Sequence, residues 1–144
     1  MNFGIYLKKL FNLDSADDFV FLSSEYIPNL NNDTFIEGTK VLGGINNCNL
    51  ILKQDANIEI EKVFHGKIIG LGNNIVRIRG EFVGTVSCHK LVIFDGGIFD
   101  GKIWTKLFAI ENKKFSVKGE FKSGDLISPS IPLDKIDFDY INQF

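Results

Sequence analysis

The sequence predicts an all-β protein: a single-stranded right-handed β-helix (solenoid) of about five to six coils, with short non-repeat segments at both ends. Glycines recur at steps of 18, 17 and 18 residues, at Gly66, Gly84, Gly101 and Gly119. A large apolar residue stands two positions before and two positions after each of them. The stretches between them alternate apolar with polar residues and are rich in Val, Ile and Phe, as strands are. Because the unit is too short for two helices, each unit is interpreted as one coil.

The coil itself is predicted from the alternation of side chains across a strand. Phe82 is expected to point inward and Glu81 outward, and the chain is expected to turn at Gly84, where a sharp bend often needs a positive φ. The chain has 14 Phe, and phenylalanines at equivalent positions of successive coils would stack into an interior ladder. The residues two positions before the four glycines are Phe64, Phe82, Phe99 and Val117.

The alternative with this period is the left-handed hexapeptide β-helix of acyltransferases. That fold needs strict six-residue sub-repeats with small corner residues, whereas these units vary between 17 and 18 and carry bulky Phe, so the right-handed form is favoured. The step from Gly43 to Gly66 is 23 residues, which predicts irregular first coils. Extra residues at 70–74 predict a bulged corner.

Length and composition limit the function. At 144 residues with 44% hydrophobic residues the chain is expected to form one domain with its own core. The formal charge of −2 excludes a basic field for nucleic acid. There is no signal-peptide pattern and no apolar run of membrane-spanning length. Cys48 and Cys88 lie far apart and are expected to be buried or half-buried thiols in a reducing compartment, so a cytoplasmic location is expected.

Residues 1–34 form the predicted N-terminal segment. A helix at 1–13 would place its apolar residues on one face, which suits contact with lipid headgroups, with lysines for anionic lipid. The alternative is a terminal helix or coil that caps an open end of the solenoid. Ser15 is a possible helix start, and the apolar run at 19–22 could be an edge strand, a cap or a docking segment. The residues of the predicted membrane contact are Phe3, Leu7, Lys8, Lys9, Leu10 and Phe11.

Residues 123–144 form the C-terminal tail. Ile136, Phe138 and Tyr140 alternate with charged residues, which predicts a strand outside the repeat. Such a strand could fold back along the solenoid as a cover, or pair with a partner by strand addition. The cover is favoured.

The His, Cys and Gly residues form no catalytic or metal-binding pattern. The two histidines, His65 and His89, cannot make a three-histidine metal site and are expected at the surface or half-buried. Cys88 and His89 are neighbours whose side chains diverge on a strand, so they do not form a nucleophilic pair. The glycines at 70–72 and 96–97 lack the following helix of a phosphate-binding loop. The protein is therefore expected not to be an enzyme and to have no catalytic residue, metal or cofactor.

Three segments carry a resemblance to a known family: 37–45, 80–86 and 96–103, the last followed by Trp104 and Thr105. They resemble the bactofilins, the polymer-forming bacterial cytoskeletal family, over about residues 35–122. The resemblance implies a right-handed β-helix domain over 35–122 whose copies assemble end to end without nucleotide. It further implies filaments or sheets at the inner face of the cytoplasmic membrane. Their role in cell-shape control would be to position peptidoglycan-remodelling enzymes. The implied partners are further copies of the chain and a cell-wall hydrolase or its membrane partner.

End-to-end assembly also has a physical reason, because each end of a β-helix exposes an unpaired strand and an open apolar core. Stacking a second copy restores hydrogen bonds worth about 0.5–1.5 kcal/mol each and buries apolar surface. The alternative is a non-polymerising binding module whose tails cap the ends and which docks a protein partner on one face. A β-helix enzyme of the acyltransferase type is the third possibility. The predicted polymer-interface residues are Val41 and Ile45 at one end and Phe115, Val117 and Phe121 at the other.

Overall fold

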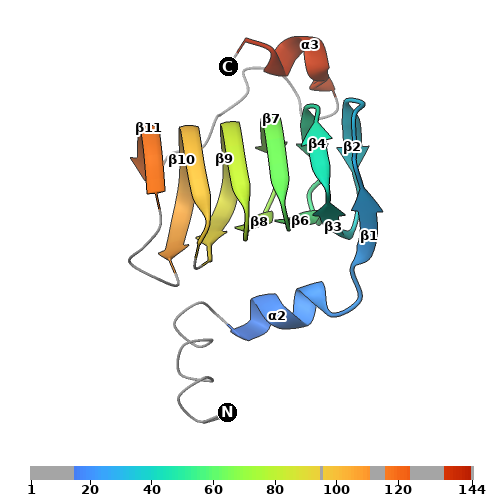
Figure 1. Ribbon diagram of the computed structural model, residues 1–144. Helices are drawn as coiled ribbons and strands as arrows, with labels where there is room; N and C mark the ends of the chain where they lie inside the picture. Colours follow the sequence, from blue (N-terminus) through green and yellow to red (C-terminus); the bar gives the residue numbers. More distant parts are fainter. Residues whose placement is uncertain (1–14, 95, 111–115, 124–134, 144) are drawn as a thin grey trace, which may run out of the picture.

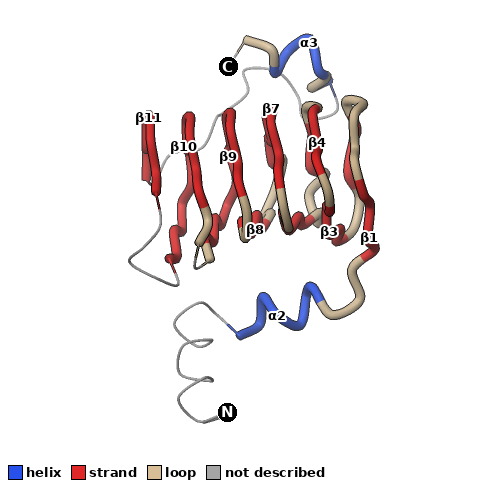
Figure 2. The backbone as a smooth tube through the Cα atoms, in the orientation of Figure 1, coloured by secondary structure: helices blue, strands red, loops and turns tan. Residues whose placement is uncertain are grey.

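The protein is a right-handed β-helix of about 5 turns (Figures 1 and 2). The computed structural model describes residues 15–94, 96–110, 116–123 and 135–143, and for 15–17, 110 and 116–123 it describes the backbone alone. Every strand pairing within this part of the chain is parallel. The predicted fold class is therefore confirmed.

The described elements are two short helices and eleven strands. The helices are α2 (Ser15–Phe21) and α3 (Phe138–Ile141). The strands are β1 (Glu25–Pro28), β2 (Thr34–Ile36), β3 (Thr39–Gly43), β4 (Ile45–Asn47), β5 (Leu50–Leu52), β6 (Asn57–Ile60), β7 (Val63–Gly70), β8 (Ile75–Ile78), β9 (Glu81–Ile93), β10 (Ile98–Ile110) and β11 (Ser116–Ser123).

The strands stack into three faces, which we name A, B and C in the order in which each coil visits them. Face A contains β1, β3, β6, β8 and the last parts of β9 and β10. Face B contains β4 and the first parts of β7, β9, β10 and β11. Face C contains β2, β5 and the parts of β7, β9, β10 and β11 that follow the corner. The chain starts on face A with β1 and ends its last coil on face C with β11.

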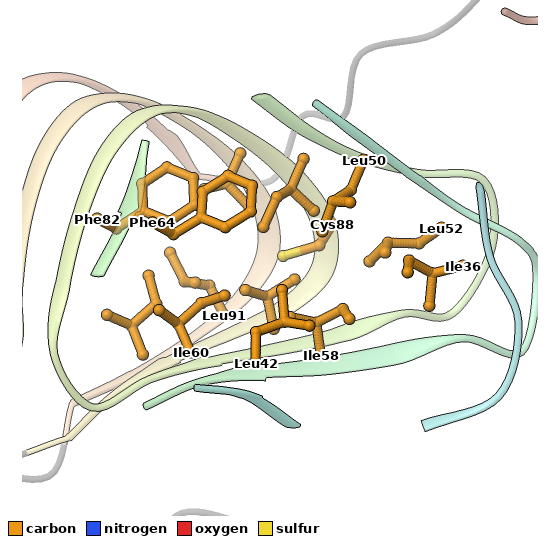
Figure 3. Close-up of a cluster of buried hydrophobic side chains, with 14 of the residues drawn as sticks. Ile36, Leu42, Leu50, Leu52, Ile58, Ile60, Phe64, Phe82, Cys88 and Leu91 are labelled. Carbon is orange, nitrogen blue, oxygen red and sulfur yellow. The ribbon is translucent and has the colours of Figure 1, made fainter. Parts of the chain in front are cut away.

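The interior is filled by columns of equivalent side chains, one from each coil. Phe64, Phe82 and Phe99 are fully buried and stack with ring centroids 5.2 and 4.8 Å apart and interplanar angles of 10° and 7°. Two of these rings and the aliphatic side chains that surround them are seen in Figure 3. The predicted phenylalanine ladder is confirmed over these three coils.

The corner between faces B and C explains the repeated glycine. Gly66, Gly84 and Gly101 have φ values of 148°, 141° and 143°, which side-chain-bearing residues rarely adopt. A Cβ on Gly84 would overlap the carbonyl oxygen of Gly66, and one on Gly101 would overlap that of Gly84. The glycine period therefore reflects the close approach of one backbone corner to the next.

The first two coils differ from the prediction. The residue stacked beneath Gly66 at this corner is Cys48, whereas Gly43 lies in β3 and is not a corner glycine. The register steps are 15 residues from β1 to β3 and 16 from β2 to β5, against 18 from β3 to β6. The irregularity predicted for the first coils is thus confirmed, but the strands begin at Glu25 rather than near residue 35.

The bulged corner at 70–74 is held by a buried asparagine. The Asn74 side chain donates to the carbonyls of Lys53 and Ala56, both at 2.7 Å, and accepts from the Gly72 N–H at 2.8 Å. These bonds satisfy backbone groups that the ladder leaves open at the insertion. Asn74 therefore stabilises the corner.

The predicted C-terminal strand is wrong, because residues 138–141 form the helix α3. Asp137 caps this helix, its carboxylate accepting from the Tyr140 N–H at 2.9 Å. Ile136 and Ile141 are buried against Ile51 and Ile69 on the outside of face C. The segment is a cover, as favoured, but a helical one, because its two ends bury apolar side chains onto one sheet face.

Candidate assembly surfaces

The N-terminal end of the solenoid is formed by β1 and β2. β1 pairs only with β3 and β2 only with β5, so the outer edge of each has no strand partner within the described residues. β1 is short and contains Pro28, which has no N–H to donate. Ile27 and Leu30 of this first coil are partly buried and close the end of the core.

Two of the predicted interface residues do not lie at this end. Val41 in β3 stands between Tyr26 of β1 and Glu59 of β6 in the ladder, one coil inside the stack. Ile45 in β4 points out of face B and is 58% exposed. The prediction misplaced them because it assigned residues 1–34 to a non-repeat segment, whereas the first coil begins within that segment, at β1. The adjacent residues Tyr26 and Ile27, both of types enriched in strands, were the available strand signal.

The C-terminal end is formed by β11. It pairs with β10 along eight residues and with no other described strand. Val117 lies opposite Phe99 and Phe121 opposite Ile103 in this register, so both predicted residues belong to the terminal strand. Phe115 lies outside the described residues. This edge is longer than that of β1 or β2 and contains no proline.

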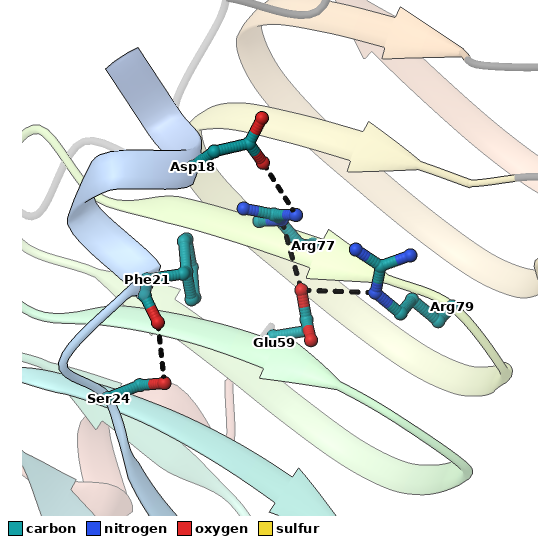
Figure 4. A network of polar contacts seen from close by, with 6 residues as sticks. All are labelled: Asp18, Phe21, Ser24, Glu59, Arg77 and Arg79. Atoms are coloured by element: carbon teal, nitrogen blue, oxygen red, sulfur yellow. Dashed lines mark hydrogen bonds and ion pairs between the residues drawn. The ribbon is translucent and has the colours of Figure 1, made fainter. Parts of the chain in front are cut away.

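Helix α2 lies across face A. Asp18 Oδ1 is 3.1 Å from Arg77 Nη2, and the Phe21 ring lies 4.5 Å from the Arg77 guanidinium carbon (Figure 4). Glu59 Oε1 lies 3.1 Å from Arg77 Nε and 3.2 Å from Arg79 Nε. Arg77 and Glu59 are close enough to form an ion pair, but Arg77 Nε and Glu59 Oε1 are not aligned for a hydrogen bond. Their attraction is therefore Coulombic. This cluster holds the helix on the side of the solenoid.

The predicted membrane contact cannot be placed, because Phe3, Leu7, Lys8, Lys9, Leu10 and Phe11 all lie outside the described residues. The described helix α2 begins four residues after Phe11. Phe19 on the helix is 73% exposed, and Leu22, which directly follows the helix, is 76% exposed. In the described part of the chain no helix is both long and apolar enough to cross a membrane.

Helix α3 lies on the outside of face C, over the first coils. The Phe138 and Phe35 rings meet edge to face at 5.0 Å. The Lys67 ammonium donates to the carbonyls of Ile141 at 3.3 Å and Asn142 at 3.1 Å, at the end of the helix where a cation is favourable. α2 and α3 therefore cover two side faces of the stack, below and above it in Figure 1.

The titratable groups show burial rather than a reactive arrangement. Burial raises the pKa of the Cys88 thiol to about 12. The pKa of the Cys48 thiol is raised to about 11, mainly by burial and to a lesser extent by the negative charge of Asp33. His65 is half-buried, as expected, with Nε2 3.0 Å from Glu81 Oε2. Over the described ranges no three His, Cys, Asp or Glu side chains come together as a metal-binding group.

The fold and these surfaces define the protein as a β-solenoid in which, among the described residues, the strands at both ends have no partner on their outer edges. No protein-family model, curated protein or solved structure matches the chain.

Proposed function

We propose that this protein is a bactofilin-like structural scaffold whose copies assemble end to end without nucleotide. The observation that carries the proposal is that both ends of the β-helix finish in parallel strands with no described partner on their outer edge, β1 and β2 at one end and β11 at the other. A β-helix end that meets another gains backbone hydrogen bonds along two or three faces at once. The described parts of both tails lie on side faces, where they leave these edges uncovered (Figure 1).

Within this proposal the polymer is a cytoplasmic platform that positions peptidoglycan-remodelling enzymes. The N-terminal segment contacts the inner face of the membrane. The exposed Phe19 and Leu22 support an apolar contact that continues from 1–13 into α2. Deleting 1–13 should release the protein from anionic liposomes in a flotation assay, and unchanged binding would remove the membrane part of the proposal.

The test of assembly is negative-stain microscopy and light scattering of the purified chain without nucleotide. Filaments or sheets are expected. Phe121→Arg places a charge in the terminal strand opposite Ile103 and should dissolve them. Ile98→Arg makes the same kind of change on face B, where Ile98 is already 45% exposed, and should leave them intact. Monodisperse monomers of the parent chain would contradict the scaffold function.

The second candidate is a non-polymerising binding module, and one observation favours it. Face B is covered by neither described helix, and it exposes Ile45, Val83 and Ile98 to 58%, 37% and 45%. Face B has five parallel strands, and the aliphatic side chains exposed on three of them offer a flat surface to a partner protein. If the parent chain stays monomeric, this face is the first surface on which to seek the partner.

A further inference from the structure

The N-terminal end of face C finishes in a very short strand. β2 has three residues, Thr34–Ile36, and among the described strands it pairs with β5 alone. Ile36 is 2% exposed in the core, whereas Phe35 points out of the face and is 45% exposed. A strand held along one edge by so few residues opens easily unless other contacts hold it. The edge that face C offers to a neighbouring copy therefore depends on contacts outside the ladder.

Helix α3 connects this terminal strand to strands deeper in the stack, and it lies over the end of the solenoid that contains β2 (Figure 1). Phe138 meets the Phe35 ring of β2 edge to face at 5.0 Å. Ile141 is 0% exposed and packs in one cluster with Ile51 of β5 and Ile69 of β7. Both β5 and β7 have strand partners on two sides, whereas β2 has a described partner on one. The helix is therefore anchored on strands that are held from both sides, and it reaches out to the one that is not.

Polar contacts fix the same anchor. Lys67 Nζ donates to the carbonyls of Ile141 at 3.3 Å and Asn142 at 3.1 Å. Asn49, which comes directly before β5, has its side-chain Nδ2 3.5 Å from Asn142 Oδ1. The backbone carbonyl of Asn49 accepts from the Thr34 N–H, the first of β2, at 3.0 Å. One residue thus contacts the helix with its side chain and the terminal strand with its backbone.

We propose that α3 is a strap that orders the N-terminal edge of face C, so that the C-terminal segment controls assembly at the end of the solenoid opposite to β11. The consequence for assembly rests on the proposed end-to-end scaffold, whereas the strap itself is a property of the single chain. When α3 is docked, β2 presents a fixed edge to a neighbouring copy. When α3 is undocked, a neighbour can pair with this edge only by ordering β2 as well, and the entropy lost in doing so weakens the joint. Because α3 follows every coil in the sequence, the edge becomes competent only after the whole solenoid has been synthesised.

The first test is amide hydrogen exchange on the full chain, below the concentration at which light scattering detects assemblies. Phe138→Ala removes the contact with Phe35 and should raise the exchange rate of the Thr34 N–H about 2- to 12-fold, the factor expected for the loss of one aromatic pair. The N–H of Arg79, bonded at 2.9 Å in the middle of the stack, should exchange as in the parent chain. Lys67→Met weakens the docking without touching either ring and should raise the same rate at Thr34.

The second test compares assembly of full chains by light scattering and negative-stain microscopy without nucleotide. Ile136→Ser with Ile141→Ser places two hydroxyls in the apolar contact and should undock α3, so that assemblies longer than a pair of chains are lost. Ile45→Ser with Ile98→Ser is the matched control, because it makes the same chemical change at two side chains that are 58% and 45% exposed on face B. The control should assemble as the parent chain does.

The outcomes separate the strap from the scaffold function. Faster exchange at Thr34 in both single variants, together with the loss of long assemblies in the Ile136→Ser, Ile141→Ser chain, supports the proposal. Unchanged exchange at Thr34 overturns the strap, and long assemblies of the undocked chain overturn its control of assembly. Either result leaves the scaffold function standing. Monomers alone from the parent chain overturn the scaffold function, and exchange at Thr34 then decides the strap by itself.

Discussion

Asp18 of α2 and Arg77 of β8 form an ion pair with Oδ1 and Nη2 3.1 Å apart, although they are 59 positions apart in the sequence. The Arg77 side chain is only 4% exposed, while that of Asp18 is 38% exposed. The pair joins a half-exposed carboxylate on a short helix to a guanidinium beneath it. It defines where the helix meets face A.

The two carboxylates around Arg77 should contribute unequally to stability. Asp18→Ala removes a partly solvated partner and should cost less than about 1 kcal/mol. Glu59→Ala removes a mostly buried carboxylate shared by Arg77 and Arg79 and should cost about 1–3 kcal/mol. Urea unfolding of both variants gives the ranking. Equal costs would mean that Glu59 is not the centre of the cluster.

A methyl group at the B–C corner should be strongly destabilising. Gly84→Ala combines a φ of 141° with overlap of the Gly66 carbonyl, and should lower the free energy of unfolding by more than about 3 kcal/mol. Gly38→Ala is the matched control, because its φ is 71° but no atom lies within 4 Å of its Cβ position. Its cost should be about 1–2 kcal/mol. Similar thermal-unfolding shifts for both would argue against the corner packing.

The phenylalanine ladder should be most sensitive at its middle ring. Phe82→Ala leaves a cavity between Phe64 and Phe99 and should cost about 3–5 kcal/mol. Its neighbour Val83 is 37% exposed, and Val83→Ala should change the free energy of unfolding by less than about 0.5 kcal/mol. Chemical denaturation of the two variants checks the inward and outward assignment directly.

The buried thiols predict a loss of stability at high pH. The pKa of Cys88 is raised from 9.0 to about 12 by burial, so the folded state favours the neutral thiol. That contribution is present below pH 9.0 and is lost as the pH rises toward 12, because the unfolded chain can ionise while the folded chain resists it. Cys88→Ala should flatten the stability profile over this range. A thiol reagent at pH 8 should react with the parent chain only after unfolding.

Removal of α3 should expose the apolar outside of face C. A chain ending at residue 134 would uncover Ile51 and Ile69, which are nearly inaccessible to solvent in the intact protein. We expect a cost of about 1.5–3 kcal/mol for each fully uncovered side chain as an upper bound, together with increased binding of a hydrophobic dye. Lys67→Met tests the polar part alone and should weaken the docking by about 1 kcal/mol.

The regular coils were predictable from the sequence alone. Stacking in parallel register requires equivalent residues to recur in every coil. The sequence repeat of Gly66, Gly84 and Gly101, each with a phenylalanine two positions before it, therefore predicts the stacked coils. Burial alternates with a period of two because a strand has two sides. The same reasoning placed Val117 and Phe121 in the last strand.

The ends were decided by tertiary structure. Cys48, and not a glycine, stands next to Gly66 at the corner between faces B and C. β1 forms although it ends at Pro28, because a terminal strand needs a partner on only one side. Residues 138–141 alternate like a strand, yet they form a helix, since Asp137 caps it and Ile136 and Ile141 find a sheet face ready to bury them. A sequence repeat reflects contacts that occur in every coil. A contact made once, such as Asp18 with Arg77 or Phe35 with Phe138, leaves no period in the sequence and exists only when the coils bring the two residues together.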